Sequence, residues 1–145
     1  MIIKFSKYHG CGNDFICLDA RGIDSDFVAI AKNWCRRGFS VGADGVVLVE
    51  DSTVADYKMT IVNADGSIPE MCGNGLRCFA AYLIDQNITS KTQLSIETVA
   101  GILGVSFTDN RFPTKLIALQ MGAAAILSDL PTCDFAFDTL QGSFE

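Results

Sequence analysis

One segment with clear helical periodicity, set among short strand-like runs, most constrains what this chain can fold into. The segment begins near Gly73 and runs to about Asp85, and an apolar stripe follows it at helical spacing. Its members are Leu76, Phe79, Ala80 and Leu83. Because strand-like runs outnumber helical ones, the pattern predicts an α+β fold with a largely antiparallel sheet wrapped around a helix.

The expected strands lie on both sides of that helix. They are residues 2–8, 14–19, 46–49 and 57–62, a hairpin over 94–107 that turns at Ala100-Gly101, and 115–121. The HGCGN sequence predicts a turn between the first two strands, with Gly and Asn supplying its positive φ.

A second helix is expected at residues 26–37, where apolar residues also recur at helical spacing. Either Ser25 or Asp24 can cap its start, and Gly38 can end it.

Length and charge narrow the classes of function. A chain of 145 residues fits one domain of typical size, and its net charge is −6 without any run of Lys or Arg. These features argue against nucleic acid and anionic membrane as partners. The N-terminal residues lack the continuous apolar core of a signal peptide, so we expect a cytoplasmic protein with reduced cysteines.

The six cysteines do not have the spacing of a metal site. No C-x-x-C pair occurs, and His9 is the only histidine. We therefore expect no bound metal and interpret most of the cysteines as small buried hydrophobic residues.

Two cysteines lie in identical tripeptides, Cys-Gly-Asn, at residues 11–13 and 72–74. Cys72 immediately precedes the central helix, whose unpaired N–H groups and dipole favour a thiolate and also form a carboxylate site. Cys11 lies in a turn between strands, where no such stabilisation is expected. The residues alone leave Cys72 open between a reactive thiol and a buried one, and favour the latter for Cys11.

Asn13 and Asn63 each lie beside a turn. Their amides can serve turn chemistry or point toward a polar ligand, and the residues alone leave both interpretations open.

Four motifs in order, HGCGNDF, GADG, NADGS and MCGNGLRCFA, resemble the first half of the diaminopimelate epimerase family. The resemblance covers residues 3–85 and continues more weakly from 93 to 122. It implies a half-molecule built as a curled sheet around a central helix, with the active site in the cleft between two such halves.

The resemblance also implies an activity that needs no cofactor. The family converts LL- to meso-diaminopimelate in lysine synthesis without pyridoxal phosphate, using two cysteines on opposite sides of the α-carbon. Carried onto this sequence, Cys72 corresponds to one catalytic cysteine. Gly73 and Asn74 correspond to substrate contacts, and Asn13 and Asn63 to polar clamps on the substrate.

The sequence departs from the family after this half. No second cysteine-glycine helix start follows residue 78, and Cys133 lacks neighbouring glycines. We therefore expect an epimerase-like domain at 1–122, and at 123–145 a tail or the start of a connection to a second domain. The chain is expected to be inactive alone and to contact a second epimerase-like half or itself.

Two alternatives remain. The chain could be a relative with the same fold, such as a proline racemase-like or phenazine-type isomerase, although NADGS and MCGNG favour the epimerase. It could also be a non-catalytic binding domain whose apolar face is covered by a partner or by self-association.

Overall fold

The computed structural model describes residues 2–109 and 115–121. Along these residues the elements are β1 (Ser6–Gly10), β2 (Asn13–Asp19), α1 (Phe27–Trp34), β3 (Gly45–Glu50), β4 (Tyr57–Asn63), α2 (Gly73–Asp85), β5 (Gln93–Thr98), β6 (Gly101–Asp109) and β7 (Leu116–Gln120). The expected boundary at residue 122 and the segment 123–145, including Cys133, lie outside the described residues. No helix in the described part is long and apolar enough to cross a membrane.

The described strands form one sheet in the order of the chain, β1 to β7. Four of the six neighbouring pairs are antiparallel, which confirms the prediction of a mostly antiparallel sheet. The pairs β2–β3 and β4–β5 are parallel, and in each of these a helix makes the connection. The sheet is therefore mixed, with two strand–helix–strand crossovers.

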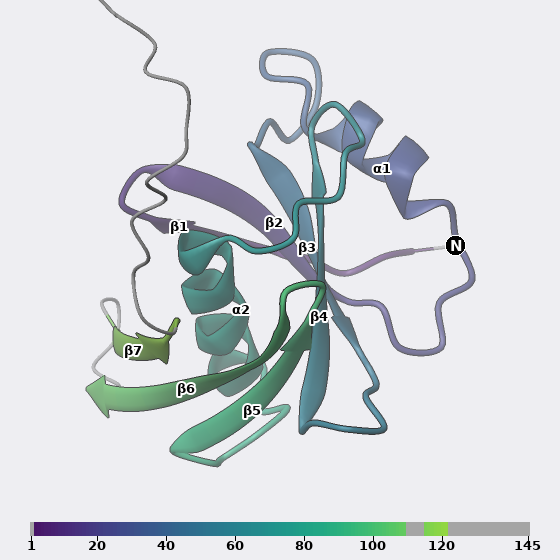
Figure 1. Cartoon of the computed structure of the whole chain (residues 1–145). Coiled ribbons are helices and arrows are strands. Elements are labelled where there is room, and N and C mark those ends of the chain that lie inside the picture. Colours follow the sequence, from purple (N-terminus) through teal and green to yellow (C-terminus); the bar gives the residue numbers. More distant parts are fainter. Residues whose placement is uncertain (1, 110–114, 122–145) are drawn as a thin grey trace, which may run out of the picture.

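The two helices cover opposite faces of the sheet (Figure 1). Crossovers of this kind are right-handed almost without exception. Both crossovers advance the same way across the sheet, but the antiparallel β3–β4 pair reverses the strand direction between them. The same handedness therefore puts α1 on the outer face and α2 inside the curl, between β1 and β7 (Figure 1).

The core around α2 follows the predicted stripe, since Leu76, Phe79, Ala80 and Leu83 are all buried. Strand β4 alternates as expected, with Met59 and Ile61 packed in the α2 cluster. Val62, the residue after Ile61, faces the other way and packs in the α1 cluster, so both faces of the strand are apolar at this end.

The first turn differs from the prediction in which residues have positive φ. Gly10 pairs with Asn13, so the turn residues are Cys11 and Gly12, with φ of 54° and 83°. A two-residue hairpin loop of this type needs positive φ at both central positions, and Asn13 is already in the strand. The expectation that Asn supplies positive φ is therefore wrong.

Helix α1 is shorter than predicted, and its cap is a different residue. Asp26 Oδ1 accepts a hydrogen bond from the Ala29 N–H at 2.9 Å, so neither Ser25 nor Asp24 caps the helix. The helix ends at Trp34, and Gly38 has a φ of 80° in the turn that follows.

Candidate active site

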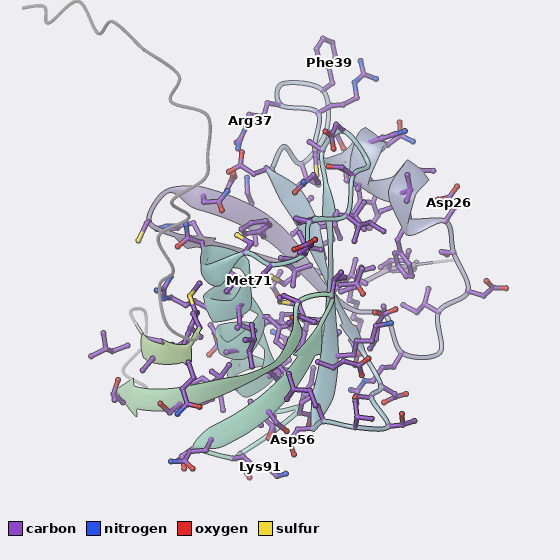
Figure 2. All side chains as sticks on the ribbon, viewed as in Figure 1. Asp26, Arg37, Phe39, Asp56, Met71 and Lys91 are labelled. Carbon is purple, nitrogen blue, oxygen red and sulfur yellow. The ribbon has the colours of Figure 1, made fainter. Side chains whose placement is uncertain are left out.

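The central feature of the site is the thiol of Cys72, which caps the N-terminus of α2. Cys72 has an extended backbone, and its Sγ accepts a hydrogen bond from the Gly75 N–H at 3.3 Å. Figure 2 labels the preceding residue, Met71, beside this end of α2. A sulfur in this position takes up one of the unpaired N–H groups of the helix and lies at the positive end of its dipole.

Glycine at position 75 lets the helix start sit directly on the core of the sheet. A Cβ on Gly75 would lie 2.6 Å from Ile61 Cδ1 and 3.6 Å from Cys72 Sγ. The absence of a side chain at Gly75 thus brings the helix N-terminus, and with it the thiol, against β4.

Asn13 is the first residue of β2, the second strand of the hairpin, and its side chain faces the same thiol. Cys72 Sγ lies 3.6 Å from Asn13 Oδ1, so the thiol S–H can donate to the amide oxygen. The two contacts of the sulfur favour opposite states, because the N–H of Gly75 stabilises a thiolate and the oxygen of Asn13 stabilises a thiol. A group that must both give and take a proton needs both states.

A cluster of charged side chains binds the nitrogen end of the Asn13 amide. Asn13 Nδ2 donates to Asp44 Oδ2 at 2.7 Å, and Arg37, labelled in Figure 2, donates to Asp44 Oδ1 at 2.8 Å. These hydrogen bonds, that of Asn13 first, lower the pKa of Asp44 below its usual range. Arg37 and Lys7 both pair with Asp14, and the hydrogen bond from Arg37 is the main reason that the pKa of Asp14 is also lowered.

This charged group was not identifiable as part of the site from sequence alone. The glycines on both sides of Asp44 are a signal that could have drawn attention to it. Nothing in the sequence pattern connects Arg37 or Lys7 with Cys72.

Gly73 and Asn74 form the first turn of α2. Asn74 lies against Gly10 of β1, and its Oδ1 accepts a hydrogen bond from Arg77 at 3.0 Å. The side chain of Met121 lies over Gly73, where an added Cβ would be 3.3 Å from Sδ. Among the described residues, the backbone N–H groups of Gly73 and Asn74 donate to no acceptor, so they are available to a carboxylate.

Asn63 lies apart from this group. It ends β4, and its Nδ2 donates to Ser67 Oγ at 2.9 Å within the NADGS turn. Its neighbour across the strands is Gly45, next to Asp44, but no hydrogen bond joins Asn63 to Cys72 in the described part of the chain. Its substrate role stays a prediction.

The other described cysteines differ from Cys72 in their surroundings. Burial raises the pKa of Cys78 to about 12 and also raises the pKa of Cys17 and Cys35. Cys11 is exposed in the hairpin turn and caps no helix among the described residues. No three His, Cys, Asp or Glu side chains gather as metal ligands within residues 2–109 and 115–121.

The fold of this chain is shared with solved structures of other proteins. It is similar to a phenazine biosynthesis protein of the PhzF family from Bacillus anthracis, with a TM-score of 0.61 at 26% identity, covering 79% of this chain and 38% of that one. A hydroxyproline epimerase from Agrobacterium vitis shares the fold, with a TM-score of 0.55 at 14% identity over 71% of this chain and 36% of its own.

The sequence defines the family more closely. The family model "Diaminopimelate epimerase" matches residues 5–127. Proteins named diaminopimelate epimerase are 46% identical over 125 residues in Halothermothrix orenii and 44% identical over 122 residues in Caldanaerobacter subterraneus. These matches cover 84% and 83% of this chain. The chain belongs to the diaminopimelate epimerase family.

The chain spans less than half the length of these relatives. The matched parts are 44% of each of the two proteins. The family assignment therefore rests on a match to less than half of each relative.

Proposed function

We propose that this chain supplies the N-terminal half of a diaminopimelate epimerase, which converts LL- to meso-diaminopimelate in lysine biosynthesis without a cofactor. One observation carries the proposal: the Cys72 thiol sits at the N-terminus of α2, in contact with both Gly75 N–H and Asn13 Oδ1. The names of the family relatives support the choice of substrate.

The proposed chemistry explains why the thiol needs a helix start. The α-proton of an amino acid is a very weak acid, so a thiolate can remove it only if the developing carbanion is stabilised. A substrate carboxylate held by the free N–H groups of Gly73 and Asn74 would lie in the field of the α2 dipole, which provides part of that stabilisation.

Inversion needs a second thiol on the other side of the α-carbon. In one direction the opposing thiolate takes the α-proton and Cys72 gives its own proton to the other face of the carbon; in the reverse direction the roles exchange. We propose that a second epimerase-like half supplies that thiol, that the complete enzyme works in the cytoplasm, and that Asn13 and Asn63 hold the polar groups of the substrate.

A domain replacement tests the proposal. The chain takes the place of the matching portion of the Halothermothrix orenii relative, to which it is 46% identical. In deuterated water, the hybrid is expected to form meso-diaminopimelate with deuterium at the inverted carbon, whereas the 145 residues alone form none. A folded hybrid without activity would contradict the epimerase assignment, and sustained meso product from the chain alone would contradict the need for a second half.

A phenazine-type isomerase is the second candidate, since the Bacillus anthracis structure shares the fold at 26% identity. Offering the hybrid a panel of cyclic and aromatic acids beside diaminopimelate separates the two candidates. Turnover of those acids alone would favour the second candidate.

A further inference from the structure

We propose that Asp44 is a positioning residue that fixes the side-chain amide of Asn13 with its carbonyl oxygen toward the Cys72 thiol. The inference deepens the proposed function, on which its catalytic meaning rests, but its test measures thiol reactivity and needs no turnover. Three residues far apart in the sequence form the chain of contacts, from Asp44 through Asn13 to Cys72.

Asp44 is itself held on several sides. Its backbone N–H donates to the Asp14 carbonyl at 2.8 Å, and its own carbonyl accepts from the Ala64 N–H at 3.1 Å. Its carboxylate accepts from the Asp14 N–H at 3.0 Å and from Arg37 at 2.8 Å. These bonds connect the residue to β2, to the segment after β4 and to the loop after α1, so its carboxylate has little freedom to turn.

The chemistry of a carboxylate then decides the orientation of the amide. An ionised carboxylate only accepts hydrogen bonds. The atom of Asn13 that lies 2.7 Å from Asp44 Oδ2 must therefore be the nitrogen, and the other atom of the amide, the oxygen, faces Cys72 Sγ at 3.6 Å. Without Asp44, either end of the amide could face the sulfur.

This orientation decides which hydrogen bond the Cys72 sulfur can make with the amide. An amide oxygen can accept the S–H of a thiol but offers nothing to a thiolate, whereas an amide N–H₂ would favour the thiolate. With Asn13 fixed by Asp44, the Cys72 thiol can donate its S–H to the amide oxygen. After its proton has passed to the α-carbon, the sulfur keeps the hydrogen bond from Gly75 N–H as a thiolate.

The test is alkylation of the 145-residue chain with iodoacetamide at neutral pH, followed by mass spectrometry of the peptide that carries each cysteine. Asp44→Ala frees the Asn13 amide, so Cys72 should react roughly three- to tenfold faster, as expected when a donor replaces an acceptor at the sulfur. Buried Cys17 and Cys78 serve as internal controls, because their rates rise only if the variant unfolds.

A double-mutant cycle shows whether Asp44 acts through Asn13. In an Asn13→Ala background, adding Asp44→Ala should leave the Cys72 rate unchanged. An equal acceleration in both backgrounds would mean simple loosening of the site and would overturn the proposal, as would no acceleration in either. If Asp44→Ala unfolds, the same criteria apply to Asp44→Asn. This variant keeps the shape of the side chain, but its amide can donate as well as accept a hydrogen bond, so it no longer dictates which end of the Asn13 amide faces it.

Discussion

At the scale of single residues, the two glycines in the first turn of α2, Gly73 and Gly75, differ in how closely they are packed. Gly75 faces the buried side chain of Ile61, where an added Cβ would meet Cδ1 at 2.6 Å. Gly73 faces Met121, whose side chain is 55% exposed and can move aside. Of these two glycines, Gly75 is therefore the one that packing requires.

This difference predicts opposite outcomes for two matched substitutions. Gly75→Ala should destabilise the chain by about 1–3 kcal/mol, since it overpacks the core at the helix start. Gly73→Ala should change the free energy of unfolding by about 0.5 kcal/mol or less, as is usual where the neighbours can yield. Urea denaturation of the two variants measures both. Equal losses would show that the helix start does not press on β4 as described.

The sequence predicts the reactive thiol more readily than Asn13, which contacts it, and Asp44, which binds Asn13. Cys72, Gly73 and Asn74 are contiguous, so a helix-start pattern contains all three. Asn13 lies 59 residues from Cys72, and it was placed with the thiol only through the family resemblance. Asp44 lies 31 residues from Asn13, and only the parallel β2–β3 pairing brings them together.

At the scale of elements, the two helices differ in how well periodicity defined their ends. Helix α2 is buried along its stripe and begins at a cysteine followed by two glycines, so its bounds were predicted closely. Helix α1 follows three residues that all cap helices well, Asp24, Ser25 and Asp26. Residue type alone cannot show which of the three caps the helix, because Asp and Ser are both favourable at that position.

The cap of α1 can be tested directly. Asp26→Ala should cost about 1 kcal/mol of stability, because it removes the acceptor of the Ala29 N–H. Asp24→Ala is the matched control and should be nearly neutral, since Asp24 is exposed and caps no helix here. Thermal and urea unfolding report the difference, and a larger loss at Asp24 would contradict the observed cap.

At the scale of the whole molecule, one carboxylate joins both ends of the curled sheet. Asp85, the last residue of α2, accepts a hydrogen bond from the Tyr8 hydroxyl of β1 at 2.9 Å. It also pairs with Lys115, next to β7, at 2.7 Å, and the Lys115 side chain is only 6% exposed. Burial and the bond to Asp85 raise the pKa of Tyr8. The contact holds the two outermost strands of the described sheet against the central helix.

Loss of this contact should loosen both edges together. Asp85→Asn should cost about 2 kcal/mol, because it removes the carboxylate that pairs with Lys115 and weakens the hydrogen bond from Tyr8. This loss should exceed that of Tyr8→Phe, which removes a single hydrogen bond worth about 1 kcal/mol. Hydrogen exchange should accelerate in β1 and β7 of the Asp85 variant. Unchanged exchange in β7 would contradict a shared contact.

The proposed function also needs more than this chain, which spans 44% of the length of two relatives. We propose that the two halves meet at the N-terminus of α2, which presents Cys72 and the backbone N–H groups of Gly73 and Asn74, for which the described residues supply no acceptor. The exposed Cys11 of the hairpin turn has the same tripeptide but no such setting. The identity of the reactive thiol is the central claim.

The most direct test compares two single substitutions in the hybrid with the Halothermothrix orenii second half. The measurement is the rate of meso-diaminopimelate formation from the LL form. Cys72→Ala should abolish inversion, because it removes the thiol proposed to serve that face of the α-carbon, and Cys11→Ala should leave most of it. Loss of activity in the Cys11 variant together with an active Cys72 variant would contradict the assignment.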